Sequence, residues 1–243
     1  MSPAISLVIP AYNEEQNIGS VVRGASHYFN NRALPYEIIV VDDGSTDTTV
    51  NEVEILSTTE PRIHIVTLGT NQGKGHAVNT GVLRAKGDII LWSDADGSTP
   101  IEEYDRFLEE FKKGADILIG SRYTTGSSIG IRQPWYRVAL GRLGNVLIRK
   151  TLLPGIMDTQ CGFKAMKREV AHTIFPKQTI NRWGFDMEIL VIAKLHGFRI
   201  KEIPVSWHDV TNRASRLRPI RDAHRTLRDL IAIKINTLRG IYS

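Results

Sequence analysis

The sequence predicts an α/β fold with a mainly parallel central sheet flanked by helices. Short apolar runs alternate with segments of helical spacing through residues 1–95, an order that implies right-handed crossovers and parallel strands. Several of these runs end in acidic or glycine-containing turns, and ligands of open parallel sheets bind at that end of the strands. At 243 residues the chain is long enough to bury a substantial core in one domain.

The first strand is predicted at Ile5–Pro10, a buried run that a proline ends. A helix is predicted over Glu14–Tyr28 from the spacing of its apolar residues. Ser45 or Asp47 can cap another helix, reaching to Leu56, because their oxygens accept hydrogen bonds from first-turn N–H groups. The remaining strands are predicted at Glu37–Val41, Arg62–Leu68, Asp88–Ser93, Ala115–Gly120 and Arg199–Val205, and the remaining helices at His76–Ala85, Pro100–Lys113, Arg132–Leu153 and Phe185–His196.

The composition is that of an ordinary soluble protein, with 42% hydrophobic and 23% charged residues. The N-terminal residues lack the basic flank and apolar region of a signal peptide. No stretch approaches the ~18–20 apolar residues that span a bilayer. A single cysteine, Cys161, excludes an intramolecular disulfide and a multi-cysteine metal site. We therefore expect a reducing, cytosolic setting.

The basic excess of the chain lies in its C-terminal part. Residues 213–243 hold eight Lys or Arg against two acidic residues, Asp222 and Asp229. The net charge of this segment, 8 − 2 = +6, exceeds the net charge of +5 for the whole chain. From residue 220 onward the apolar residues recur at helical spacing, and four arginines lie on the opposite face. These are Arg221, Arg225, Arg228 and Arg239.

This pattern divides the chain into a domain over residues 1–212 and a basic amphipathic helix over 213–243. Such a helix either lies on an anionic membrane surface or packs on the domain. Nucleic-acid binding is not expected, because the domain has no aromatic platform or recognition motif.

Two acidic strand ends predict a binding crevice. Asp94 and Asp96 directly follow the apolar run that ends at Ser93, and Asp42 follows the run that ends at Val41. Two carboxylates at i and i+2 can hold one hard cation, and Mg²⁺ commonly shares its shell with substrate phosphates. An ordinary turn also uses such an acidic pair. A second acidic strand end at the same edge of the sheet favours the crevice.

Basic residues near the same edge suit a phosphate. Lys74 lies in a glycine-containing loop before a helix, where N–H groups favour anions, although a surface lysine fits equally well. Arg122 follows the strand that ends at Gly120, and a guanidinium fork matches phosphate geometry. Arg132 and Arg137 offer a second cluster of the same kind. The chain lacks both the Walker P-loop and the G-x-G-x-x-G fingerprint, which argues against a nicotinamide dinucleotide site.

Further acidic residues have open roles. Asp158 lies in a polar, glycine-containing segment that we predict to be a structured loop in an otherwise helical region. The open roles for Asp158 are a base, a phosphate positioner and a turn former. Asp186 and Glu188 are interpreted as charges that stabilise a helix N-terminus. The seven histidines show no metal-ligand spacing.

Six of these motifs together resemble the family 2 glycosyltransferases, especially the polyprenyl-phosphate sugar synthases that use glucose or mannose. The matching segments are Val8–Glu15, Val40–Asp47, Asn71–Gly75, Asp94–Asp96, Gly120–Tyr123 and Asp158–Phe163. The resemblance covers nearly the whole chain. It implies the GT-A nucleotide-diphosphosugar transferase fold.

The resemblance also implies roles for individual residues. Pro10, Ala11, Tyr12 and Glu14 are expected to contact the base and ribose of the donor, with Asp42 on the base and Lys74 among the nucleotide-sugar ligands. Asp94 and Asp96 are expected to hold Mg²⁺ or Mn²⁺ against the diphosphate. Arg122 and Arg137 are expected to receive the acceptor phosphate and the donor diphosphate. The catalytic set is then Asp96, Arg122, Arg137 and Asp158.

The activity implied is inverting transfer of a hexose to a polyprenyl or dolichyl phosphate, and the segment at Asp158 favours UDP-glucose as donor. GDP-mannose is the alternative donor. A family 2 transferase acting on a saccharide hydroxyl is another alternative, with Asp158 or Asp186 as base. A non-catalytic nucleotide-sugar binder is the third. The expected location is peripheral, on the cytosolic face of a membrane, through the C-terminal helix and the helix at 132–153.

Overall fold

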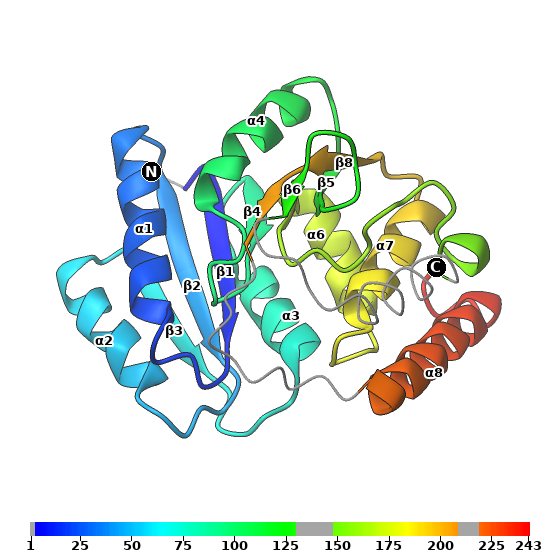
Figure 1. Ribbon diagram of the computed structural model, residues 1–243, viewed down its shortest axis with the longest axis horizontal. Helices are drawn as coiled ribbons and strands as arrows, with labels where there is room; N and C mark the ends of the chain where they lie inside the picture. The colour runs from blue at the N-terminus through cyan, green and yellow to red at the C-terminus, as the bar shows by residue number, and fades with distance from the viewer. Residues whose placement is uncertain (1–2, 130–147, 209–218) are drawn as a thin grey trace.

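The computed structural model describes residues 3–129, 148–208 and 219–243, and it has helices on both faces of one seven-stranded sheet (Figure 1). The strand order is β3-β2-β1-β4-β7-β5-β8. The strands are β1 Ile5–Ala11, β2 Tyr36–Asp42, β3 Ile63–Thr67, β4 Ile89–Trp92, β5 Ile117–Ser121, β7 Lys164–Lys167 and β8 Ile200–Pro204. A small separate pair joins β6 Ser128–Ile129 to β9 Ser206–Trp207.

One strand of the sheet runs against the others. β7 is antiparallel to both β4 and β5, while the remaining neighbours are parallel. Lys164, the first residue of β7, pairs with Trp92 near the end of β4 and with Ile119 in β5. The segment before β7 therefore arrives at the edge of the sheet where the parallel strands end.

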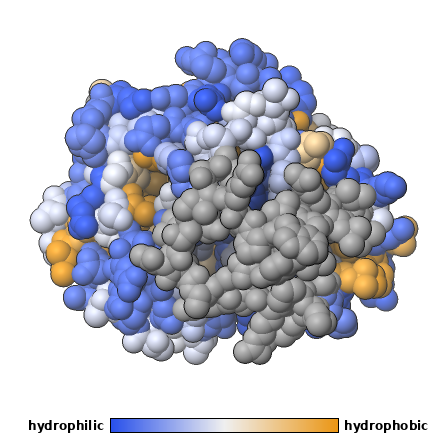
Figure 2. All heavy atoms as spheres, viewed as in Figure 1, coloured by the Kyte–Doolittle hydropathy of each residue, from blue (hydrophilic) through white to orange (hydrophobic). Residues whose placement is uncertain are grey.

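Each face of the sheet has its own core, because successive strand residues point to opposite sides. Ile5, Leu7 and Ile9 pack with one set of helices, while Val8 packs with the other. The first set is α1 Ile18–Asn31, α2 Thr49–Thr59, the 3₁₀ turn η1 Ile101–Glu103 and α4 Tyr104–Lys112. The second is α3 Lys74–Arg84, α6 Arg168–Ile174, η2 Phe175–Lys177, α7 Phe185–Leu195 and α8 Pro219–Leu238. The surface over α1 and α4 is largely hydrophilic (Figure 2).

The predicted α/β class and parallel arrangement are confirmed, with three differences in the elements. The first helix begins at Ile18 rather than at Glu14, because residues 14–17 form a loop bound to the segment after β2. The helix predicted over Pro100–Lys113 is split into η1 and α4. The loop predicted at Asp158 is confirmed, but its surroundings are not helical throughout, since the loop leads into β7. Most of the helix predicted at Arg132–Leu153 lies outside the described residues.

The C-terminal helix α8 packs on the domain beside α7. Leu230 and Ile233 of α8, and Tyr242 beyond it, are buried in the core that includes α7. A β-carbon on Gly184, which precedes α7, would lie 2.4 Å from Asp229 Oδ2 of α8, so the two helices approach closely there. Within the part of the chain that the structure describes, no helix has the length and apolarity needed to cross a bilayer.

Candidate active site

The loops after β1 and β2 bind each other. The Asn13 N–H donates to Ser45 Oγ at 2.9 Å, and the Glu14 N–H donates to Thr49 Oγ1 at 2.7 Å. Thr48 donates to Glu15 in the opposite direction. Asn13 has φ 55°, a left-handed conformation that asparagine tolerates better than most residues. These bonds fix the segment from Pro10 to Glu14 at the end of β1, so the four residues assigned there to base and ribose lie together.

The two aspartates at the end of β2 bind backbone N–H groups. Asp42 accepts hydrogen bonds from Gly44 and Ser45, and it is buried within its own turn. Asp43 accepts from the N–H groups of Gln72 and Gly73 at 2.7 and 2.8 Å. Asp43 therefore fixes the loop that leads to Lys74. Sequence reasoning gave Asp43 no role, and its position directly after Asp42 was the one available signal.

Lys74 and Asp94 form the first ion pair of the site. Lys74 Nζ lies 2.5 Å from Asp94 Oδ1, and it also lies 5.0 Å from the centre of the Trp183 ring. Burial opposes the charge of each partner, but the attraction between them dominates, so the pKa of Lys74 is raised and that of Asp94 is lowered. A β-carbon on Gly162 would lie 2.1 Å from Asp94 Oδ2. Glycine at 162 therefore leaves the space that the carboxylate occupies.

Arg122 and Asp158 form the second ion pair. The guanidinium donates through Nε at 2.8 Å and Nη2 at 2.9 Å, and the backbone N–H of Arg122 donates at 3.0 Å. Asp158 is fully buried, and the carboxylate of Glu202 holds the N–H groups of Met157 and Asp158. Burial would raise the pKa of Asp158, but the hydrogen bonds and charge of Arg122 hold that pKa below its usual range.

Asp158 is thus an anchor for Arg122 rather than an available proton acceptor. Its oxygens are occupied by three donors from Arg122, and its carboxylate is held in the ionised form. Of the roles left open for Asp158, the geometry supports the positioning one.

Lys164 and Asp186 form a third pair, which the sequence did not predict. Lys164 Nζ lies 2.5 Å from Asp186 Oδ1, and both side chains are buried. Lys164 also donates to the carbonyl oxygen of Cys161. The Cys161 thiol is itself buried, and burial raises its pKa to about 11. Asp186 does lie in the first turn of α7, as predicted, but its carboxylate binds Lys164.

Glu188 has a structural role that its position in a first helical turn did not suggest. Its buried carboxylate accepts hydrogen bonds from the Thr179 N–H and hydroxyl, from the Ile180 N–H at 2.8 Å, and from the Tyr242 hydroxyl at 2.6 Å. It therefore joins the C-terminal residues to the loop before α7.

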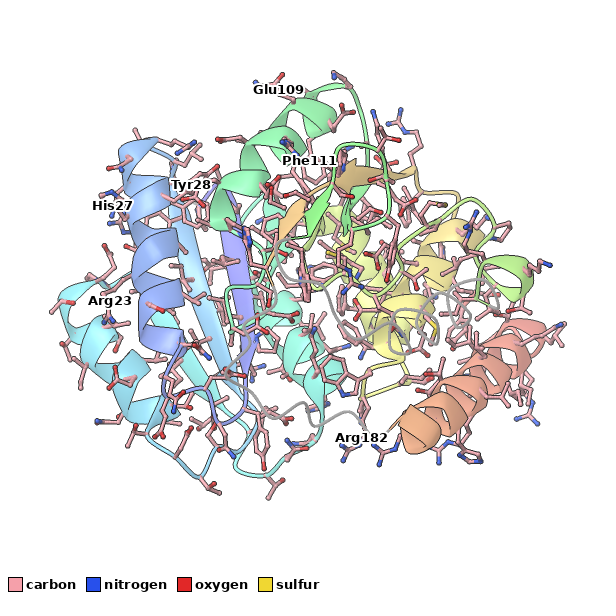
Figure 3. The ribbon with its side chains drawn as sticks, viewed as in Figure 1. Arg23, His27, Tyr28, Glu109, Phe111 and Arg182 are labelled. Atoms are coloured by element: carbon pink, nitrogen blue, oxygen red, sulfur yellow. The ribbon has the colours of Figure 1, made fainter. Side chains whose placement is uncertain are left out.

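That loop rests on the N-terminal turn of α3, which begins with Lys74. The His76 N–H donates to Asn181 O at 3.0 Å, and Gln178 Nε2 donates to Gly75 O at 3.0 Å. Arg182, in the same loop, lies toward the start of α8 (Figure 3). Lys74 is thus connected to Tyr242 through the loop before α7 and the carboxylate of Glu188.

The acidic turn after β4 provides oxygen donors that fit a hard divalent cation. Asp96 Oδ1 accepts the Ser98 N–H at 2.9 Å, and its side chain lines a cavity of about 330 Å³ between α1 and η1. Among the described residues no group of three or more His, Cys, Asp or Glu converges. Asp94 and Asp96 could supply two oxygen ligands of the kind that Mg²⁺ and Mn²⁺ take, with the remaining ligands from outside these side chains.

The structure thus brings most of the predicted site residues to one edge of the sheet. The ends of β1, β2, β4 and β5 supply the segment from Pro10 to Glu14, Asp42, the acidic turn and Arg122, and the loop before β7 supplies Asp158. Arg132 and Arg137 lie outside the described residues, so their assignment stays a prediction.

Comparisons with known proteins agree with this geometry. The chain is 38% identical over 216 residues to a dolichyl-phosphate beta-glucosyltransferase of Trichomonas vaginalis, covering 84% of this chain and 64% of the relative. It is 33% and 32% identical to proteins of that name from Dictyostelium discoideum and Homo sapiens, covering 98% of this chain and 76% and 77% of those relatives. The chain therefore spans about two thirds to three quarters of the length of these relatives.

A solved structure shares the fold. Glucosyl-3-phosphoglycerate synthase from Mycobacterium tuberculosis, in complex with Mn²⁺, UDP and glucosyl-3-phosphoglycerate, superposes with a TM-score of 0.66 at 22% identity, covering 96% of this chain and 79% of that one. The predicted GT-A fold is confirmed. Residues 6–175 match the family described as Glycosyl transferase family 2, and the chain belongs to that family.

Proposed function

We propose that this protein transfers glucose from UDP-glucose to a polyprenyl or dolichyl phosphate, with inversion, to give a β-linked lipid-phosphate sugar. The observation that carries the proposal is the set of ion pairs at one edge of the sheet, in which carboxylates hold Lys74 and Arg122 beside the acidic turn. Similarity to dolichyl-phosphate glucosyltransferases supports the acceptor and the sugar. The UDP complex of the structural neighbour supports the donor.

The donor would lie across the ends of β1, β2 and β4. The segment from Pro10 to Glu14 and Asp42 would bind the nucleoside, and Lys74 would bind the diphosphate. A divalent ion held by Asp94 and Asp96 would neutralise negative charge on the diphosphate, which is the usual contribution of a metal in such sites. Lys74 adds a fixed positive charge at the same place, and preorganised charge of this kind is commonly the largest catalytic effect.

The acceptor would bind at Arg122. Asp158 takes the Nε and Nη2 side of the guanidinium, and we assign the Nη1 side to the acceptor phosphate. An oxygen of that phosphate attacks the anomeric carbon as the bond from this carbon to the diphosphate oxygen breaks, and UDP leaves with the electron pair. A phosphate monoester is already largely dianionic near neutral pH, because its second pKa is about 6. No proton has to be removed by the protein.

The ion pairs also bear on the alternative acceptor. A saccharide hydroxyl would need a general base, and both candidates, Asp158 and Asp186, are held by a cation. This arrangement favours a phosphate acceptor. A peripheral location on a membrane, with the basic C-terminal helix as the contact, belongs to the same proposal because polyprenyl phosphates are membrane lipids. The cytosolic face stays a prediction.

The test is a donor and acceptor matrix. Purified protein with Mg²⁺ or Mn²⁺ is incubated with UDP-glucose or GDP-mannose, each with and without a short polyprenyl phosphate, and release of the nucleoside diphosphate is measured. Release with UDP-glucose that depends on the lipid phosphate supports the proposal. Release only with GDP-mannose would overturn the sugar. Turnover with saccharide acceptors alone would overturn the acceptor.

A further inference from the structure

Helix α8 has two apolar faces, of which only one is used by the fold. Leu230 and Ile233 are buried against the domain. Another set of apolar side chains on α8 and just beyond it is 40–80% exposed, with Leu238 the most exposed. We call this set the α8 ridge, and it consists of Leu227, Ile231, Ile235, Leu238 and Ile241. Neighbouring members are three or four residues apart, so they form one line along the helix.

The ridge is a continuous line of apolar side chains rather than a set of scattered ones. Single exposed apolar residues need no explanation, but a continuous apolar line usually marks a contact surface. Leu195, at the end of α7, is also exposed and extends it, and apolar surface is visible on the side of the molecule that α8 occupies (Figure 2). The apolar residues predicted along this helix include both the buried set and the ridge. In the structure the buried set packs on the domain, and the ridge stays exposed to solvent.

The charges around the ridge are almost all positive. Exposed basic side chains of α8 and the residues after it flank the ridge, namely Arg225, Arg228, Lys234 and Arg239. Asp229 is the one acidic residue among 224–243, and it lies against Gly184 on the side facing α7. A partner for this face must therefore accept apolar side chains and carry negative charge.

An apolar groove opens beside the ridge. It has a volume of about 380 Å³ between α7 and α8 and is lined by Leu152, Leu195 and Leu238. Lys194 and Lys234 also line it. Ammonium groups beside an apolar groove match the phosphate and the upper acyl chain of an anionic lipid, because lysine keeps its charged end in the headgroup region while its stem contacts hydrocarbon.

We infer that the α8 ridge is a docking surface for an anionic bilayer, on which α8 lies flat while its opposite face remains packed on the catalytic domain. Apolar side chains inserted at the headgroup boundary and flanking basic residues are the two contributions that bind interfacial helices. Each basic residue near an anionic surface adds attraction that salt screens. The inference deepens the proposed function, since it names the surface that supplies the lipid acceptor, but the binding itself requires no substrate.

The experiment measures sedimentation of the full chain with vesicles of phosphatidylcholine, with and without phosphatidylserine. Phosphatidylserine at about 30 mol% makes the vesicles strongly anionic. We expect binding to the anionic vesicles that weakens with added salt. The double variant Ile231→Glu/Leu238→Glu should reduce the partition coefficient at least tenfold. Ile55→Glu, at an exposed apolar residue of α2, is the matched control and should bind as the wild type does. All variants alter exposed positions, so unchanged thermal unfolding temperatures are expected.

Other results would overturn the inference. Equal binding of the double variant and the wild type would remove the ridge from the contact. If neither protein binds vesicles, and the wild type is a dimer while the double variant is a monomer, the ridge would be assigned to contact with a second copy of the chain. Turnover of a water-soluble short-chain polyprenyl phosphate separates the two proposals. The double variant should turn over this substrate as the wild type does. If the wild type does not turn it over, the proposed function is contradicted, while the inference about vesicle binding is unaffected.

Discussion

The sheet has one edge where its parallel strands begin and one where they end, and these two edges carry the same kinds of ion pair in different environments. At the edge where the parallel strands begin, Asp88 pairs with Arg168 at 3.1 Å and Asp116 pairs with Lys167 at 2.8 Å. At the edge where they end, Asp158 pairs with Arg122 at 2.8 Å. Asp88 is 72% exposed, whereas Asp158 is 0% exposed.

Burial decides what each kind of pair does. An exposed pair contributes about 0–1 kcal/mol and is screened by salt. A buried pair is costly to form, and removing one partner costs about 3–5 kcal/mol because an uncompensated charge stays behind. The exposed carboxylate of Asp88, where the strands begin, can therefore be lost with little consequence. Asp116 at the same edge is 16% exposed, so its loss should affect stability but not catalysis. At the other edge the carboxylates fix cations beside the proposed diphosphate and phosphate sites, so loss of one should be detected in catalysis.

The largest difference between the edges is expected at β4, which has an aspartate beyond each end. Asp94→Asn removes the charge that holds Lys74 and one proposed metal ligand, and Asp96→Ala removes the other. Each should lower kcat by at least about 100-fold, the usual effect of losing a preorganised electrostatic group. Asp88→Asn, at the other end of the strand, should leave kcat unchanged. The measurement is steady-state transfer together with thermal unfolding.

These variants can contradict the comparison directly. Asp96→Ala should keep the fold, because Asp96 is partly exposed and its bond to Ser98 is local. Normal turnover by Asp96→Ala with an unchanged metal optimum would remove the acidic turn from the reaction. An equal loss in Asp88→Asn would show that charge anywhere on this strand matters, not the edge.

Asp158 and Asp116 provide the next test, since both carboxylates accept hydrogen bonds from cations and backbone N–H groups. Asp158→Asn should lower kcat by about 10- to 100-fold, as expected for loss of a residue that orients a direct ligand. Asp116→Asn should affect stability alone. If Asp158 positions Arg122, the pH profile of the remaining activity should keep its wild-type shape. Loss of an acid limb in the variant would instead identify Asp158 as a base.

The sign of the pH dependence follows from the lowered pKa values. The pKa of Asp158 is held below its usual range by Arg122, and that of Asp116 is lowered to about 2, where the hydrogen bonds from Lys167 and Arg199 outweigh burial. Each carboxylate therefore stabilises the fold fully above the unfolded value of about 4. That stability is lost as the pH falls through the folded pKa. Urea unfolding between pH 5 and 2 (about the range in which carboxylates titrate) should depend less on pH in either asparagine variant.

A smaller effect is expected at β2, where Glu37 and Asp43 lie near opposite ends. Both buried side chains accept backbone N–H groups, from Lys86 at 2.6 Å and from Gln72 at 2.7 Å. Asp43→Asn should raise the donor KM about tenfold with little change in kcat, since one hydrogen bond to a charged group contributes about 1.5–3 kcal/mol. Glu37→Gln should lower the unfolding temperature without changing the donor KM. A change in kcat alone for Asp43→Asn would contradict a loop-fixing role.

The comparison of edges also separates what the sequence could predict from what it could not. Asp42, Asp94 and Arg122 each lie within two residues of the end of a predicted strand, so the alternation of strands and helices was enough to place them at one edge. Lys164 was missed, and Glu188 was assigned only to a helix N-terminus, because their partners come from pairings that local patterns do not encode. Lys164 depends on the antiparallel strand β7, whose four residues carry no clear alternation. Glu188 depends on Tyr242, which is 54 residues away along the chain.

The smallest expected effect tests how far the carboxyl edge extends into the rest of the molecule. Tyr242→Phe keeps a buried ring but removes the hydroxyl that donates to Glu188 at 2.6 Å. Tyr28→Phe makes the same change on α1 (Figure 3), on the other side of the sheet. The Tyr28 hydroxyl donates to Asp105 at 2.7 Å. Each hydroxyl should contribute about 1–2 kcal/mol to stability, so the two variants are matched in the fold.

They should differ in the site. Glu188 also binds Thr179 and Ile180, whose loop lies against the turn that begins with Lys74. Loss of the Tyr242 hydroxyl should therefore speed hydrogen exchange of the amides in residues 178–184 and raise the donor KM about two- to fivefold, a change of under about 1 kcal/mol. Tyr28→Phe should do neither. If both variants lose stability but neither changes exchange or KM, the C-terminal residues support the fold without reaching Lys74, and the functional edge ends at α7.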